Sequence, residues 1–210
     1  MQTPHIREFL GKRVHMIGIG GSSMSGLAQM LLEKGYRVTG SDNMQSHTVE
    51  KLSAMGIPVA VGHRAENVQG ADLAVYSAAI LPDNPERVAL AELQIPNMER
   101  AALLGQLMEG YSEAVAISGT HGKTTTTAML SQILLEGGMD PTIHIGGRLD
   151  AVGGSTRIGE GEAFVAEACE FSGSFLHMHP TVAVVLNIEE DHLDYYKDIN
   201  DIQDAFGKFL

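Results

Sequence analysis

The stretch AVAISGTHGKTTTTAML, residues 114–130, decides the fold class. An apolar run at residues 114–118 predicts a buried strand, and the apolar spacing of residues 124–136 predicts a helix. Between them, GTHG lets backbone N–H groups turn inward at a helix N-terminus, which favours an anion. A strand that runs through a glycine loop into a helix is the repeating unit of α/β proteins, and here the loop predicts a phosphate site.

Two side chains of this loop suit nucleotide chemistry. Lys123 would reach the terminal phosphates, and Thr124 would offer its hydroxyl to magnesium. The usual phosphate loop has a first glycine where this sequence has Ile117, so the loop is a shortened variant. The alternative is an ordinary strand-to-helix turn that contains glycine and lysine.

A second strand, loop and helix precede this one. GIGGSSMSG, residues 18–26, follows a predicted strand, and Asp42 follows the next strand. The pattern resembles the dinucleotide fingerprint but has Ser23 at the third glycine position. It indicates a diphosphate-bearing ligand without choosing between NAD and a UDP-sugar, and a simple tight turn is the alternative.

Composition narrows the class of protein. The chain has 210 residues, 44% of them apolar, and a formal net charge of -12. Such an acidic chain is a poor partner for nucleic acid or anionic membranes. The lone cysteine, Cys169, excludes an internal disulfide, and no signal peptide or membrane-spanning run is present. We expect a soluble cytoplasmic protein.

Alternating strands and helices predict an α/β fold with parallel sheets. The expected strands are 14–19, 37–40, 57–61, 73–76, 114–118, 164–167 and 182–186, and the expected helices are 24–34, 48–55, 86–93, 101–108, 124–136 and 201–210. A polar break at 109–113 places a domain boundary near residue 110. We therefore expect a Rossmann-like domain at 1–110 and a partial P-loop domain at 111–210.

Two polar residues stand at predicted strand ends in the second domain. Glu167 ends one strand and His192 follows another, and ligands of open α/β sheets bind at the carboxyl ends of strands. Lys123, Glu167 and His192 could therefore converge beside a triphosphate, with magnesium as the metal. The alternative is that Glu167 is a capping residue and His192 faces solvent.

Taken together, these segments resemble the Mur ligase family. The most specific stretches are GTHGKTTTT at 119–127 and NIEEDHLD at 187–194, joined by HMIGIGGSSMSGLA at 15–28, DNPE at 83–86 and VAEACE at 165–170. Cys169, Phe171 and Gly173 depart from residues that many members carry, while Glu167 and Glu170 remain. Within the family the match is best to members that join L-alanine to UDP-N-acetylmuramate.

The resemblance implies an ATP-dependent ligase with Mg2+ in peptidoglycan synthesis, acting through an acyl phosphate, with Lys123, Glu167 and His192 as catalytic residues. The implied ATP-binding residues are Ser118, Gly119, Thr120, His121, Gly122, Lys123, Thr124 and Thr125. The implied UDP-sugar-binding residues are Gly18, Gly20, Gly21, Ser22, Ser41, Asp42, His63 and Ser77. The implied metal ligands are Thr124, Glu167 and His192.

The resemblance also implies three domains, of which this chain would hold the first and part of the second, with residues around the adenine lying beyond position 210. We expect the chain alone not to ligate. Three alternatives stay open: a sister ligase that recycles murein tripeptide, an NAD-dependent oxidoreductase, and a UDP-sugar-binding module.

Overall fold

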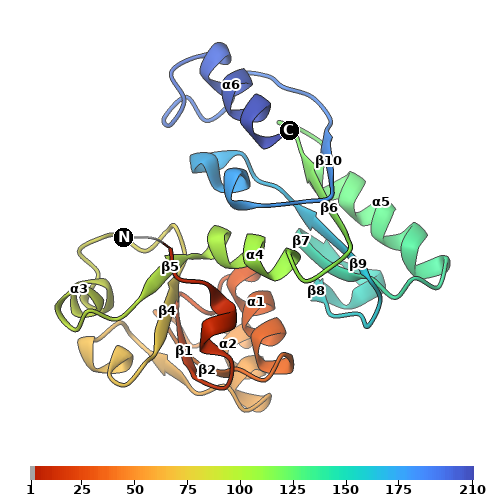
Figure 1. Cartoon of the computed structure of the whole chain (residues 1–210). Helices are drawn as coiled ribbons and strands as arrows, with labels where there is room; N and C mark the ends of the chain where they lie inside the picture. The colour runs from red at the N-terminus through yellow and green to blue at the C-terminus, as the bar shows by residue number, and fades with distance from the viewer. Residues whose placement is uncertain (1–2) are drawn as a thin grey trace. The chain divides into compact units, whose positions relative to one another are not determined.

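The computed structural model describes residues 3–210 and divides the chain into two compact units. The first unit runs up to Leu103 and the second is Leu104–Leu210. Each unit has its own five-stranded sheet (Figure 1). The predicted α/β fold with parallel sheets is confirmed, and the division falls inside helix α4 (Arg100–Met108), a few residues before the expected position near 110.

The first unit has the sheet order β3-β2-β1-β4-β5, and all of its strand pairs are parallel. Its strands are β1 (Arg13–Ile17), β2 (Arg37–Asp42), β3 (Val59–Val61), β4 (Leu73–Tyr76) and β5 (Asn97–Glu99). Its helices are η1 (Ile6–Phe9), α1 (Ser22–Glu33), α2 (His47–Ala54), η2 (Ala65–Val68), α3 (Pro85–Glu92) and the start of α4.

Strand β1 lies at the centre of this sheet, and four of its five residues are buried. Helix α1 buries Met24, Leu27 and Leu31, an apolar face at helical spacing. Strands β2 and β3 extend to one side of β1, whereas β4 and β5 extend to the other. The loops after β1 and β4 therefore open at the topological switch point, where ligands of such sheets bind.

The second unit has the sheet order β10-β6-β9-β7-β8. Its strands are β6 (Glu113–Ser118), β7 (Thr142–Leu149), β8 (Gly154–Arg157), β9 (Ala163–Glu167) and β10 (Val182–Val185). Its helices are the rest of α4, then α5 (Lys123–Glu136), η3 (Asp150–Val152), η4 (Phe171–His177) and α6 (Ile199–Phe209). Only β8 runs antiparallel to its neighbour, at the edge of the sheet.

Two helices contribute to the core of the second unit, α5 against the sheet and α6 against η4. Helix α5 packs along β6, β7 and β9, as Figure 1 shows. On α6, the rings of Phe206 and Phe209 each lie 5.0 Å from the ring of Phe175, which is fully buried. Asp198 caps α6 by accepting hydrogen bonds from the N–H groups of Asn200 and Asp201. Among residues 3–210, no helix is long and apolar enough to cross a membrane.

Three strands were not predicted: β5, β7 and β8. β5 has only three residues, and β7 contains the pair Gly146–Gly147, which favours a turn by local signals. β8, GSTR, has no apolar residue and forms only as the antiparallel partner of β7. Predicted elements elsewhere have the right type, with ends that differ by a few residues.

Candidate functional site

The first glycine loop connects β1 to α1 at the centre of its sheet. Gly18 has φ +78°, in the left-handed region that favours glycine. Gly21 is the N-cap of α1 and makes no side-chain hydrogen bond to the helix. A helix N-terminus without a side-chain cap offers its first N–H groups to an anion. The residues predicted to hold a diphosphate, Gly18, Gly20, Gly21 and Ser22, thus gather at such a terminus.

Asp42 shapes this loop directly. One carboxylate oxygen accepts a hydrogen bond of 2.9 Å from the backbone N–H of Gly20, and the other accepts one of 3.3 Å from Met44. A Cβ on Gly20 would stand 2.8 Å from the same carboxylate, so a side chain there would displace it. The structure gives Asp42 a loop-holding role, and its predicted contact with a ligand stays a prediction.

Two further polar groups border the loop. Arg100 Nη1 donates a hydrogen bond of 3.0 Å to Ser23 Oγ, which places a cation beside the first turn of α1. Sequence analysis did not single out Arg100, because only the fold brings the start of α4 to this helix. Ser77 follows β4, and its Cβ lies 3.6 Å from where a Cβ on Gly18 would be. Its predicted role in binding a UDP-sugar remains open.

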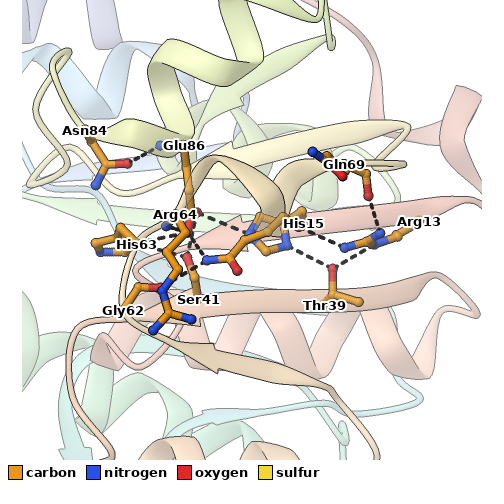
Figure 2. Close-up of polar contacts among 11 residues, drawn as sticks. Arg13, His15, Thr39, Ser41, Gly62, His63, Arg64, Gln69, Asn84 and Glu86 are labelled. Atoms are coloured by element: carbon orange, nitrogen blue, oxygen red, sulfur yellow. Dashed lines mark hydrogen bonds and ion pairs between the residues drawn. The ribbon is translucent and has the colours of Figure 1, made fainter.

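Ser41 and His63, both predicted ligand residues, meet at a buried carboxylate (Figure 2). Ser41 Oγ donates to Glu86 Oε2 at 2.7 Å and lies 3.1 Å from His63 Nδ1. His63 Nδ1 lies 3.4 Å from Glu86 Oε1. Glu86, whose side chain is 0% exposed, belongs to the quoted DNPE stretch but was predicted only as part of a helix.

Glu86 is ionised despite its burial. Burial on its own would raise the pKa of this carboxyl, but hydrogen bonds from His15, Asn67 and Ser41 outweigh it and lower the pKa from 4.5 to about 2. Asn67 Nδ2 donates to Glu86 Oε1 and also to the carbonyl of Gly62 at 3.0 Å. The ionised carboxylate therefore fixes the loop that carries His63.

The second glycine loop connects β6 to α5. Gly119 has φ +140°, and Gly122, the N-cap of α5, is left-handed with φ +86°. A Cβ on Gly119 would lie 3.1 Å from the Leu186 side chain and 3.2 Å from the backbone of Asn187. As at α1, no side chain caps the helix. The loop thus has the form expected of an anion cradle, and α5 begins one residue earlier than predicted.

Lys123, the first residue of α5, folds back over this loop. Its Nζ donates to the carbonyls of Gly119 and Thr120 and to Glu170 Oε1. Glu170 stands just after β9 in a buried position. The ammonium group is therefore held above the loop, where a phosphate would lie, by a carboxylate that sequence analysis noted but did not include in the site.

The loop is tied to the segment that follows β10. The N–H of Thr120 donates to the Asn187 carbonyl at 3.1 Å, and the N–H of His121 donates to Asn187 Oδ1 at 2.8 Å. Thr120 Oγ1 accepts from the N–H of Glu189 at 2.9 Å. These bonds confirm that the ends of β6 and β10 converge, as the parallel sheet predicts.

Thr124 and Glu167 each lie close to one residue of the glycine pair in β7. A Cβ on Gly146 would stand 2.7 Å from Glu167 Oε2, and one on Gly147 would stand 2.9 Å from Thr124 Cγ2. Glu167 Oε1 is buried and has no hydrogen-bond partner in the part of the chain that the structure describes. A hydroxyl and an unsatisfied carboxylate suit magnesium, so these residues fit the predicted metal.

His192, the third predicted metal ligand, lies against Phe171, with 4.9 Å between ring centroids. Its φ of +52° is rare for a residue with a side chain and marks local strain. No contact between His192 and Thr124 or Glu167 is recorded within residues 3–210, nor does any group of three His, Cys, Asp or Glu there suit a metal ion. Its role as a ligand stays a prediction.

The other residues predicted to bind ATP differ in how far their side chains are exposed to solvent. Ser118 is fully buried, and its Oγ donates to the Ala168 carbonyl at 2.8 Å, so its hydroxyl joins β6 to the end of β9. His121, Thr124 and Thr125 are exposed, as a ligand contact requires. Contact between Ser118 and ATP stays a prediction.

The chain thus presents two α/β units, each with a glycine loop at an uncapped helix N-terminus, the second with a lysine over the loop. Comparison with family models gives the Mur ligase catalytic domain at residues 13–112 and the Mur ligase middle domain at residues 117–210. The chain belongs to the Mur ligase family.

Curated relatives are similar over nearly the whole chain. It is 58% identical over 199 residues to UDP-N-acetylmuramate–L-alanine ligase of Acetivibrio thermocellus, a match that covers 95% of this chain and 42% of that protein. It is 54% identical to the ligase of the same name from Clostridium novyi, covering 94% and 43%. The chain therefore spans less than half the length of these relatives.

Solved structures give the same family. The crystal structure of UDP-N-acetylmuramate-alanine ligase from Thermotoga maritima has a TM-score of 0.86 at 32% identity, covering 94% of this chain and 46% of that one. The UDP-N-acetylmuramate:L-alanyl-gamma-D-glutamyl-meso-diaminopimelate ligase from Neisseria meningitides has a TM-score of 0.85 at 32% identity, covering 94% and 67%.

Proposed function

We propose that the protein to which this chain belongs joins L-alanine to UDP-N-acetylmuramate in peptidoglycan synthesis, in the cytoplasm, with ATP and Mg2+. The first unit would hold the UDP-sugar and the second would hold the triphosphate. The observation that carries the ATP-dependent part is Lys123, which Glu170 holds over the Gly119–Gly122 loop. The same unit contains Glu167, whose buried Oε1 has no hydrogen-bond partner among the described residues. The names of the curated relatives support the two substrates.

The reaction would run in two balanced steps. A carboxylate oxygen of UDP-N-acetylmuramate attacks the γ-phosphorus of ATP, the bond to the bridging oxygen breaks, and ADP leaves. The amine of L-alanine then attacks the acyl phosphate carbon, the carbon–oxygen bond breaks, and inorganic phosphate and a proton leave. Neither step needs a protein nucleophile, so the protein contributes position and charge neutralisation.

Residues of the second unit would supply that neutralisation. Lys123 would turn from Glu170 toward the transferring phosphoryl group, and the N–H groups at the start of α5 would face the same oxygens. Thr124 and Glu167, with the predicted His192, would hold Mg2+, which when bound offsets negative charge on the phosphates. Gly146 and Gly147 would leave space for the ion.

Residues of the first unit would hold the UDP-sugar. The loop from Gly18 to Ser22 would take the diphosphate, with Arg100 as a cation beside it. Asp42, His63, Ser41 and Ser77 would lie toward the nucleoside. Heat on titration of the 210-residue chain with UDP-N-acetylmuramate, and none with NAD, is the expected result. Heat with NAD alone would favour the oxidoreductase alternative and contradict the proposal.

Ligation is tested in the protein extended to the length of its curated relatives. ADP release should require both UDP-N-acetylmuramate and L-alanine. Release with murein tripeptide but not with L-alanine would favour the sister ligase, to which the structural similarity is nearly equal. We also propose that the 210-residue chain alone binds without turnover, and alanine-dependent product formation by that chain would contradict this.

A further inference from the structure

Five polar groups of the first unit contact the Glu86 carboxylate, and three of them, Ser41 Oγ, Asn67 Nδ2 and the Arg64 N–H, donate hydrogen bonds to it. Ser41 Oγ and His15 Nε2 approach its Oε2 at 2.7 and 3.3 Å. The Asn67 side chain, the Arg64 N–H and His63 Nδ1 approach its Oε1. Figure 2 shows His15, Ser41 and His63 around this carboxylate. Because that carboxylate is ionised, it can only accept hydrogen bonds.

This restriction fixes the proton on His63. Its Nδ1 faces two oxygens, Ser41 Oγ at 3.1 Å and Glu86 Oε1 at 3.4 Å. A serine hydroxyl has one hydrogen, and Ser41 gives it to Glu86 at 2.7 Å. Both neighbours of Nδ1 are therefore acceptors, and Nδ1 must carry the hydrogen. In the neutral ring, Nε2 then has a lone pair.

The hydrogen bonds on the His15 side of Glu86 also donate toward the carboxylate. Arg13 Nε donates to Thr39 Oγ1 at 3.2 Å, so Thr39 has its own hydrogen left for His15 Nδ1 at 3.0 Å. His15 Nε2 then carries its hydrogen toward Glu86. The hydrogen bonds that run from Arg13 through Thr39 and His15 thus all donate in the direction of Glu86. This side of the network gives Glu86 no hydrogen that it could donate to His63.

The lone pair on His63 Nε2 is available to a ligand. Within residues 3–210, no hydrogen-bond partner of Nε2 is recorded, and this atom is not among the buried unpartnered ones. His63 also lies next to the predicted ligand site, because Ser41, its neighbour, accepts the backbone N–H of Gly18 through its carbonyl at 2.9 Å.

We propose that Glu86 is a specificity-determining positioning residue, which holds His63 with Nδ1 protonated so that Nε2 accepts a hydrogen bond from a uridine donor of the bound nucleotide. This inference rests on the proposed function of the first unit and deepens it. Uracil offers an imide N–H and ribose offers hydroxyls, whereas cytosine has an acceptor in place of the imide N–H. A site with an acceptor at this point selects against cytidine if the imide is the partner.

The first test is nitrogen NMR of the histidine rings in the unaltered 210-residue chain at neutral pH. The ring shifts distinguish a protonated nitrogen from one with a lone pair. We expect His63 to be protonated at Nδ1. A neutral His63 protonated at Nε2 would overturn the inference without any substitution.

The second test compares Glu86→Gln with Thr39→Val by calorimetry with UDP. The amide of Gln can donate to His63 Nδ1 and so place the hydrogen on Nε2. We expect about tenfold weaker UDP binding in E86Q, the loss of about one hydrogen bond. Thr39→Val disturbs the His15 side of the network without touching His63, and it should retain both the UDP affinity and the His63 tautomer.

Ligand analogues identify the donor. N3-methyl-UDP removes the imide N–H, and 2′-deoxy-UDP and 3′-deoxy-UDP each remove one ribose hydroxyl. One of these should bind the unaltered chain about tenfold more weakly than UDP and should lose no further affinity in E86Q. If folded E86Q bound UDP as tightly as the unaltered chain does, the inference about Glu86 would be overturned but the proposed function would not. Failure of the unaltered chain to bind UDP at all would instead contradict the proposed function.

Discussion

Lys123 Nζ lies 2.9 Å from Glu170 Oε2, and the two side chains are only 17% and 4% exposed. The pair is thus largely shielded from water, where attraction between charges is stronger than at a surface. The same ammonium group is the one expected to face the phosphates of ATP. If Lys123 binds these phosphates as proposed, Glu170 and the nucleotide would compete for one cation.

This competition predicts the effect of Glu170→Gln. The amide keeps the shape of the side chain but removes a negative charge near the loop, so ATP binding to the chain should tighten about tenfold. Glu136→Gln is the matched control, because Glu136 ends the same helix, far from Lys123 in sequence, and its carboxylate accepts a hydrogen bond from Gln132. Calorimetric titration with ATP measures both. Weaker binding in E170Q would mean that Glu170 holds Lys123 in the orientation that ATP requires.

Lys123→Ala should separate catalysis from binding of the UDP-sugar. Lys123 would neutralise charge that grows in the transition state, so its loss should slow ligation by about two orders of magnitude or more. UDP-N-acetylmuramate affinity should be unchanged, because that ligand is assigned to the first unit. The rate is measured as steady-state ADP release by the protein extended to the length of its curated relatives. Ligation at the parental rate would remove Lys123 from the mechanism.

Gly146→Ala should impair magnesium-dependent binding of ATP. The added methyl group would stand 2.7 Å from Glu167 Oε2 and force that carboxylate to move. ATP affinity with magnesium should fall at least severalfold, and affinity without magnesium should change little. Gly154→Ala is the control, since a Cβ there meets nothing within 4 Å and its φ is not positive. Equal loss with and without magnesium would argue against a metal at Glu167.

Glu86 predicts a dependence of stability on acid pH. Its folded-state pKa is lowered from 4.5 to about 2, so it stabilises the fold above pH 4.5. That contribution, about 3 kcal/mol at 1.36 kcal/mol per unit, is lost as pH falls from 4.5 through 2. Urea unfolding across this range should show a flatter pH dependence in Glu86→Gln than in the unaltered chain. Parallel curves would show that another carboxylate is responsible.

Sequence analysis predicted the parts of the site that are built from residues close together in the chain. Both strand–loop–helix units and the convergence of the ends of β6 and β10 follow from apolar spacing and glycine loops. Gly21 and Gly122 therefore stand at helix N-termini as expected. Element types depend on nearby residues, so apolar periodicity was enough to assign them.

The parts that sequence reasoning missed depend on contacts between distant residues. Glu86 meets His15, which is 71 positions away, and Arg100 meets Ser23, which is 77 positions away. No spacing rule connects such pairs. The β7–β8 hairpin was missed for a related reason, because its edge strand is polar and becomes a strand only by pairing.

The hydrogen bonds of Asn187 have a mechanical consequence. Its backbone carbonyl and both polar atoms of its side chain are bonded to Thr120 and His121 of the phosphate loop. A displacement of the loop is therefore transmitted to the chain five residues before His192. His192, with its strained backbone, follows in the same segment, so we expect nucleotide binding at the loop to shift the position of that imidazole.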